Sequence, residues 1–68
     1  MYSTWWFEVV TECSDLEGEQ FFVEVNTTLD KAKAEATKIA QENFPDEELR
    51  CYGRVSGVEA EMMGLDTY

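Results

Sequence analysis

The stretch of sequence that decides the fold is WWFEVVTEC, which occupies residues 5–13. Its residues alternate in character, and the side chains of a β-strand point to opposite faces at every step. One face therefore carries the predicted core residues Trp5, Phe7, Val9, Thr11 and Cys13. The other face is mixed and carries Trp6, Glu8, Val10 and Glu12. We expect this strand to lie at the centre of the fold.

A second alternating run occupies residues 20–26, after a polar turn at residues 14–19 that contains Gly18. Two such runs joined by a short turn predict a β-hairpin. The residues expected to face the core are Phe21, Val23 and Val25. The residues expected on the opposite face are Phe22, Glu24 and Asn26.

Residues 28–43 are predicted to form a helix. The sequence TTLD at residues 27–30 offers a capping hydroxyl and an acidic residue three positions later, a pattern typical of helix starts. Apolar residues then recur at three- and four-residue steps and form one stripe, made of Leu29, Ala32, Ala36, Ile39, Ala40 and Phe44. Pro45 predicts the end of the helix, because the residue before a proline avoids helical geometry.

Residues 49–55 alternate again and predict a third strand. Its expected core residues are Leu49, Cys51 and Val55, and its expected outward residues are Arg50, Tyr52 and Arg54. Ser56 and Gly57 indicate a turn or a bulge. Residues 58–62 alternate once more, and either continue the third strand or form a short fourth one. From Gly64 onward we expect a tail.

The 68 residues therefore predict a single α+β domain with the element order β-β-α-β or β-β-α-β-β. A right-handed crossover through the helix would place the third strand beside the first. The expected sheet is antiparallel, with three or four strands, and the first strand lies between the second and the third. The helix would cover one face of this sheet and leave the other face in water.

The charge of the chain restricts its partners. Fifteen acidic residues, five basic residues and no histidine give a formal net charge of −10. Direct binding to nucleic acid or to an anionic membrane is excluded, because such binding needs clustered basic side chains. We expect a basic protein partner instead, since the field of the chain would accelerate its approach. An acidic surface that serves only solubility is the alternative.

Cys13 and Cys51 form neither a disulfide framework nor a metal site by their number and spacing. Both lie on predicted core faces, so we expect free buried thiols rather than a disulfide bond. The chain has no secretory leader pattern and no run that approaches the roughly 20 apolar residues of a membrane span. These observations predict a cytoplasmic protein.

The open face of the predicted sheet is the first candidate binding surface. It would combine the aromatic residues Trp6, Phe22 and Tyr52 with the carboxylates of Glu8, Glu12 and Glu24. Aromatic side chains flanked by charge are typical of the centres of protein interfaces. Alternatively, the three aromatic residues are cross-strand neighbours that cover one another. A homodimer built on this face would agree with both interpretations.

Clusters of acidic residues are the second candidate surface. One cluster follows the helix and contains Asp46, Glu47 and Glu48, and others lie at residues 15–19 and 59–61. We expect the turns at residues 14–19 and 46–48 to lie at opposite ends of the sheet. Carboxylates arranged along the body would then imitate a DNA duplex, which carries one negative charge per about 1.7 Å of its axis. The alternative is an ordinary solvated surface.

The residues do not favour catalysis. The chain has no histidine for proton transfer near neutral pH, and no serine or cysteine lies at a suggestive spacing from a base. Asp15, Glu17 and Glu19 lack the ligand number and spacing of a calcium-binding loop. We therefore expect no cofactor and no metal site.

The aromatic strand at 5–13, the alanine-rich helix at 28–43, the strand at 49–55 and the excess of acid together resemble small phage-encoded inhibitors of bacterial defence, including anti-CRISPR and anti-restriction proteins. The resemblance is one of size, element order and charge, and it assigns no residue a role. It implies an inhibitor or adaptor in the host cytoplasm, with an acidic surface that occupies a basic groove of a nucleic-acid-binding protein. The alternative function is a self-associating structural or assembly subunit that uses the aromatic face.

Overall fold

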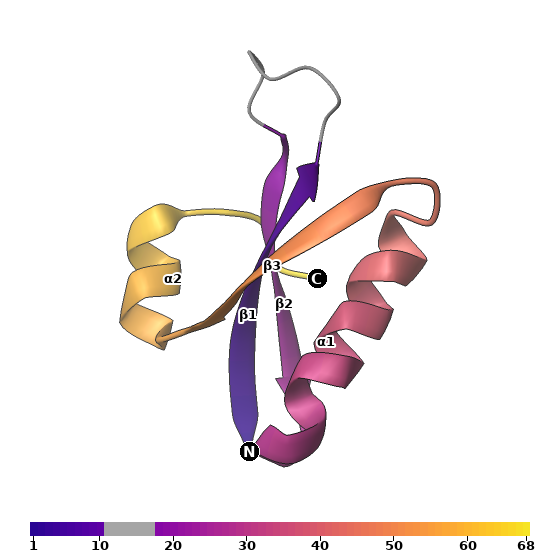
Figure 1. Ribbon diagram of the computed structural model, residues 1–68. Helices are drawn as coiled ribbons and strands as arrows, with labels where there is room; N and C mark the ends of the chain where they lie inside the picture. Colours follow the sequence, from indigo (N-terminus) through magenta and orange to yellow (C-terminus); the bar gives the residue numbers. More distant parts are fainter. Residues whose placement is uncertain (11–17) are drawn as a thin grey trace.

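The computed structural model describes residues 1–10 and 18–68. Along the chain these residues form β1 (Tyr2–Val10), β2 (Gln20–Asn26), α1 (Leu29–Asn43), β3 (Glu48–Val55) and α2 (Gly57–Met63) (Figure 1). The sheet has the order β2-β1-β3, and β1 pairs antiparallel with both neighbours. The α+β class, the strand order and the central position of β1 are therefore confirmed. The predicted turn at 14–19 and the end of the predicted first strand fall largely outside the described residues.

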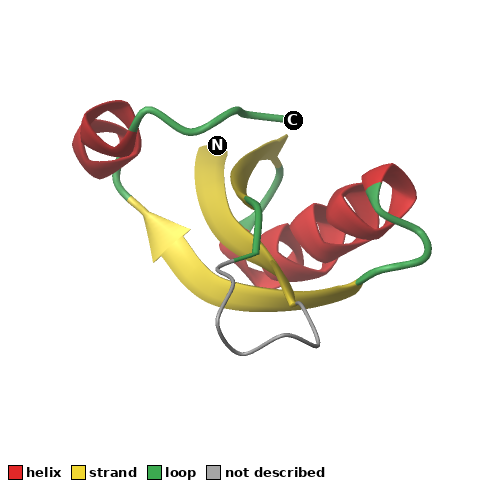
Figure 2. Cartoon of the chain, turned by 90° about the horizontal axis from the view of Figure 1, so that it is seen from above, coloured by secondary structure: helices red, strands yellow, loops and turns green. Residues whose placement is uncertain are grey.

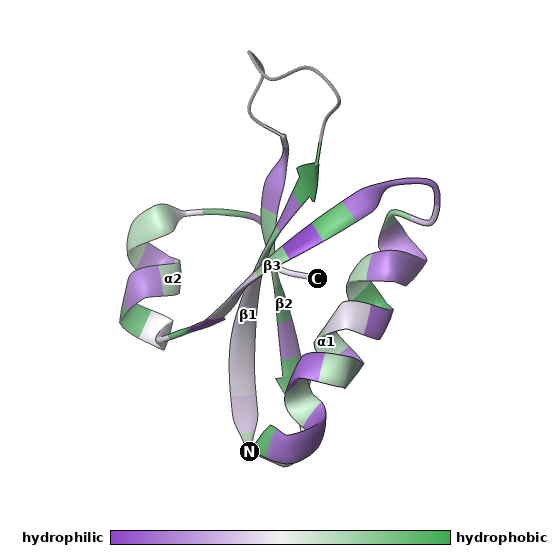
Figure 3. Cartoon of the chain, viewed as in Figure 1, coloured by the Kyte–Doolittle hydropathy of each residue, from purple (hydrophilic) through white to green (hydrophobic). Residues whose placement is uncertain are grey.

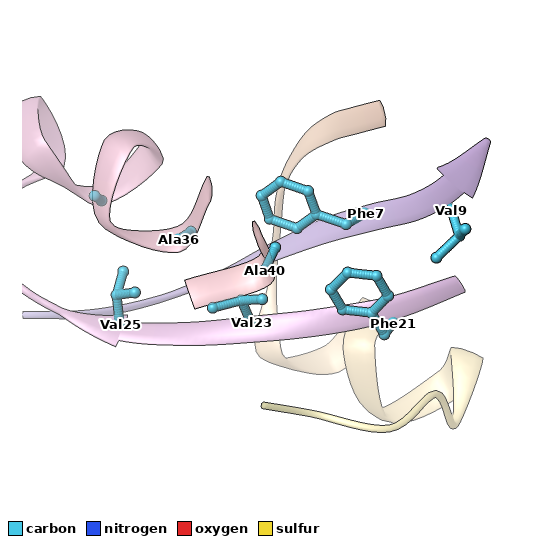
Figure 4. Close-up of a cluster of buried hydrophobic side chains, with 8 residues drawn as sticks. Phe7, Val9, Phe21, Val23, Val25, Ala36 and Ala40 are labelled. Carbon is cyan, nitrogen blue, oxygen red and sulfur yellow. The ribbon is translucent and has the colours of Figure 1, made fainter. Parts of the chain in front are cut away.

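The main core lies between the sheet and α1. Small side chains bring the helix close to the strands, because Ala32, Ala36 and Ala40 are fully buried. They face alternate residues of the two neighbouring strands, and Figure 4 shows the cluster with Phe7, Val9, Phe21, Val23 and Val25. Ile39, Phe44, Leu49 and Cys51 are partly buried against it. The alternation predicted for residues 5–9 and 21–25 is confirmed on this face.

The start of α1 follows the local sequence signal in its position but not in its capping contact. The carbonyl oxygen of Thr28 accepts hydrogen bonds from the N–H groups of Lys31 and Ala32, but the Thr28 side chain makes no capping hydrogen bond. The helix begins as predicted, without the predicted hydroxyl cap. Leu29 is 44% exposed rather than part of the buried stripe, because it occupies the first position of α1, before the helix meets the sheet at Ala32.

β3 contains a bulge opposite the middle of β1. Phe7 pairs with Cys51, whereas Trp6 pairs with Gly53, so Tyr52 is one residue more than β1 can match. Gly53 has a φ of 114°, a backbone conformation that is essentially restricted to glycine. The bulge therefore lies within the strand, not at Ser56 and Gly57 as the sequence suggested.

The bulge exchanges the faces of the last two residues of β3. Directly paired residues of an antiparallel sheet share a face. Arg54 pairs with Trp5 on the α1 face, and Val55 pairs with Thr4 on the opposite face. The predicted burial of Val55 and exposure of Arg54 are confirmed, but the sheet faces predicted for them are exchanged, because one extra residue inverts the alternation. Val55 is nevertheless buried, at 8% exposure.

Residues 57–63 form α2, so the predicted strand over residues 58–62 is wrong. The Ser56 side chain accepts a hydrogen bond from the Glu59 N–H at 3.1 Å. Gly64 adopts the left-handed conformation, and its N–H donates to the Ala60 carbonyl oxygen at 3.2 Å. A serine cap, a glutamate three residues later and a closing glycine are helix signals that the short alternation obscured.

We expect Gly53→Ala to lower the free energy of unfolding by about 1–3 kcal/mol, because the φ of Gly53 is strained for any residue with a Cβ atom. No described atom lies within 4 Å of the added Cβ, so the loss would report on the backbone alone. The matched control is Gly57→Ala, which is equally unobstructed, lies in the first turn of α2 and should not lower stability. Urea denaturation measures both. Equal stability of Gly53→Ala and wild type would contradict the bulge.

Candidate interaction surface

An aromatic pair lies on the sheet face opposite α1. The rings of Trp6 in β1 and Tyr52 in the β3 bulge have centroids 4.4 Å apart and are tilted by 33°. Trp6 is half-buried, and its Nε1 is buried without a hydrogen-bond partner among the described residues. Tyr52 remains 44% exposed. Two of the predicted aromatic residues are therefore neighbours, and Tyr52 covers part of Trp6.

Phe22 is not available on this face, although the sequence predicted it as a binding residue. It pairs with Trp6 in the register of β1 and β2, yet it is only 1% exposed. The chain after α2 returns to the outer edge of β2 at this point: the Phe22 N–H donates to the Asp66 carbonyl oxygen, and the Tyr68 N–H donates to the Phe22 carbonyl oxygen, both at 2.8 Å. The predicted tail is thus a part of the fold and is hydrogen-bonded to the backbone of Phe22, whose side chain is not exposed on the open face.

Residues 65–68, which we call the C-terminal segment, pass along the edge of β2 (Figure 2). Glu24 donates a third backbone hydrogen bond, to the Tyr68 carbonyl oxygen at 3.1 Å. The Tyr68 ring then packs edge-on against Phe21 and Phe44 on the α1 side, with centroid distances of 5.3 and 5.8 Å. The segment therefore protects an otherwise open sheet edge and links both faces of the sheet.

The predicted carboxylates of this face occupy different environments. Glu8 is half-buried between Gln20 of β2 and Arg50 of β3, and it accepts a hydrogen bond from Gln20 Nε2 at 3.1 Å. Glu24 is exposed near the edge of the sheet. Glu12 lies outside the described residues. Glu8 is thus built into the sheet, whereas Glu24 is free to meet a partner.

The turn between α1 and β3 presents Asp46, Glu47 and Glu48, all exposed. Gln41 braces this turn, because its Nε2 donates to the carbonyl oxygens of Phe44 and Glu47 at 3.1 and 3.3 Å. Glu48 pairs with Val10 and Gln20 pairs with Glu8, so the turn lies at the end of the sheet where β1 ends and β2 begins. The 14–19 turn lies largely outside the described residues. Val10 and Gln20, which flank it, are at the same end of the sheet as the 46–48 turn and not at the opposite end as predicted, since α1 runs back along β2 to its start.

Basic side chains are confined to two elements. The basic residues all lie in α1 and β3 and are exposed: Lys31, Lys33, Lys38, Arg50 and Arg54. Residues 1–30 and 55–68 contain no lysine or arginine. Every acidic residue that the structure describes is exposed except Glu8. β1, β2, α2 and the C-terminal segment therefore contribute carboxylates without contributing a basic side chain.

The sequence interpretation missed α2 as a surface element. Its exposed apolar residues include Val58 and Met62, which were assigned to a strand. α2 starts beyond Val55, which pairs with Thr4, and so lies at the other end of β3 from the 46–48 turn (Figure 1). The capping signals at Ser56 and Gly64 were the available clue.

No protein family, curated protein or solved structure matches the chain. Within residues 1–10 and 18–68, no group of three or more His, Cys, Asp or Glu side chains is placed to hold a metal ion. No helix in the described part of the chain is long and apolar enough to cross a membrane. Cys51 is a free thiol, partly buried against the core, and Cys13 lies outside the described residues.

Removal of residues 65–68 should speed amide hydrogen exchange at Phe22 and Glu24 at least about tenfold relative to Phe21 and Val23. The first two amides donate to the C-terminal segment, whereas Phe21 and Val23 alternate with them and face β1. Exchange followed by NMR measures this ratio, which a uniform loss of stability would leave unchanged. An unaltered ratio would show that the segment does not cover the β2 edge in solution.

Proposed function

We propose that the chain is a non-enzymatic inhibitor or adaptor whose acidic surface binds a basic groove of a nucleic-acid-handling protein. The observation that carries this proposal is the separation of charge: carboxylates cover the molecule, while all basic side chains lie in α1 and β3. A partner that approaches β1, β2, α2 or the C-terminal segment meets carboxylates, and these elements carry no basic side chain that would offset the negative charge. Such a field favours rapid association with a basic surface.

The dimensions of the molecule agree with a mimic of duplex DNA. Its longest extent is 37 Å. A duplex of that length carries about 22 phosphates, and a groove contacts only those on one side. The chain carries 15 acidic residues, and those of the 46–48 turn and of α2 lie at opposite ends of β3. Because phosphate contacts depend on charge and position rather than on base sequence, carboxylates alone can imitate them.

The turn at residues 46–48 is the strongest electrostatic contact point in this proposal. It presents three consecutive exposed carboxylates, and the Gln41 hydrogen bonds hold its backbone in place. A braced turn loses less conformational entropy on binding than a mobile one. The Glu47 N–H, which donates to the Phe44 carbonyl oxygen at 3.2 Å, further restrains it.

We further propose that the chain acts in the cytoplasm, and in the manner of the phage-encoded inhibitors of bacterial defence that it resembles. The support is its small size, its element order and its acidity. A defence nuclease or its nucleic-acid-binding subunit offers the basic groove that the proposal requires.

Self-association through the aromatic face has less support. Phe22, one of its three predicted contact residues, is 1% exposed, and Trp6 is partly covered by Tyr52. Pairing between the sheet edges of two copies is also disfavoured. The C-terminal segment covers the edge of β2, and the edge strand β3 carries a bulge and two arginines.

The double variant Asp46→Lys, Glu47→Lys should bind its partner at least about tenfold more weakly, because two attractions become repulsions. The tagged wild type, immobilised and exposed to a bacterial lysate at low salt, should retain nucleic-acid-binding proteins that duplex DNA or high salt releases. The control Asp30→Lys, Glu35→Lys makes the same charge change on α1, which already carries the three lysines. This control variant should still retain the nucleic-acid-binding proteins of the lysate.

Retention by the double variant equal to that of wild type would contradict the role of the 46–48 turn. Retained proteins that neither duplex DNA nor high salt releases would contradict the proposed function itself.

A further inference from the structure

The outer surface of α2 exposes apolar side chains that the fold does not use. Val58 is 67% exposed and Met62 is 82% exposed. They lie four residues apart, so they are neighbours on one face of the helix. No residue of α2 is buried. Figure 3 shows hydrophobic residues on α2 interspersed with hydrophilic ones. Burial of apolar surface therefore does not account for this helix.

Local hydrogen bonds nevertheless hold α2 in one shape. Ser56 caps its first turn and Gly64 closes its last. Val55, directly before the cap, is buried, and Asp66, directly after Leu65, is hydrogen-bonded to β2. A helix of seven residues is marginal without such support. The residues before and after α2 are fixed to the sheet. Binding of a partner to Val58 and Met62 should therefore cost little conformational entropy of the backbone.

The charge around these two residues identifies the partner surface. Glu59 and Glu61 lie on α2 beside them, Asp66 follows, and residues 55–68 contain no lysine or arginine. A two-fold contact between α2 and α2 of a second copy would bring these carboxylates against one another. A nucleic acid or an anionic membrane would be repelled for the same reason.

We infer that α2 is a docking element, and that its Val58 and Met62 side chains enter an apolar pocket rimmed by lysines or arginines on the protein partner. Met62 suits this role, because its unbranched thioether side chain adapts to the shape of a pocket. Glu59 and Glu61 would pair with the rim. The inference rests on the proposed function and adds to it an apolar contact that resists salt.

Two synthetic peptides serve as probes: an amphipathic helical Leu/Lys peptide, and a Ser/Lys peptide with the same number of lysines. The wild type should bind the Leu/Lys peptide about tenfold more tightly in low salt, because only this peptide buries Val58 and Met62. Val58→Ser, Met62→Ser should abolish that difference. Leu29→Ser, an exposed apolar residue of α1, is the matched control and should preserve it. Fluorescence anisotropy measures the affinities.

The neutral pair Glu59→Gln, Glu61→Gln should weaken both peptides and reduce the salt dependence of binding, while the preference for leucine remains. NMR shift changes on titration with the Leu/Lys peptide should concentrate at residues 57–63. Because Val58 and Met62 are exposed, their serine variants should keep the circular dichroism of the wild type, and Met62→Gln alone gives a second, milder test.

Equal affinity for the two peptides, or an unchanged preference in Val58→Ser, Met62→Ser, would overturn the inference and leave the proposed function intact. Failure to bind either peptide in low salt would overturn both. Concentration-dependent dimerisation of the wild type that these serine substitutions abolish, seen by analytical ultracentrifugation, would assign α2 to a second copy and also overturn the inference.

Discussion

The bulge at Tyr52 and Gly53 is the constraint on which the arrangement of the two faces depends. Without the extra residue, Val55 would continue the α1 face and Arg54 the opposite one. With it, Val55 is buried opposite α1, and Tyr52 contacts Trp6. After Val55 the chain forms α2, which lies on the other side of the strands from α1 in the view of Figure 1. A single extra residue of β3 therefore determines which of its last side chains share a face with Trp6 and which share a face with Trp5.

Regular periodicity explains which parts of the fold could be predicted from the sequence. Residues 5–9, 21–25 and 32–40 alternate or repeat over several turns or steps, and the residues predicted to face α1 are buried or partly buried there, whereas Phe22 breaks the alternation. The incorrect predictions lie where a short alternating run contains a bulge or the caps of a helix. Gly53 allowed a bulge that inverted Arg54 and Val55, and the caps of α2 outweighed five alternating residues. The burial of Phe22 was not predicted, because the alternation does not show that residues 65–68, more than forty positions along the chain, return to hydrogen-bond with its backbone.

Burial of Phe22 also changes the balance between the two candidate surfaces. The aromatic face retains Trp6 and Tyr52, whose rings contact each other, while α2 carries Val58 and Met62, the latter the most exposed large apolar side chain of the described residues. Carboxylates surround α2 and extend to the 46–48 turn at the other end of β3. We therefore regard the molecule as an acidic surface with one apolar contact element, carried by a sheet whose β2 edge is covered by the C-terminal segment. This combination favours a basic partner over self-assembly.

The central structural claim, that the bulge reassigns the faces of β3, has a direct test in the cross-strand contacts of β1 and β3. The nuclear Overhauser effects of the labelled protein report which residues of the two strands lie opposite each other. With the bulge, we expect Thr4 opposite Val55, Trp5 opposite Arg54 and Phe7 opposite Cys51. A regular strand without the extra residue would instead place Thr4 opposite Arg54 and Trp5 opposite Gly53. That second pattern would contradict the bulge, and with it the position we assign to α2.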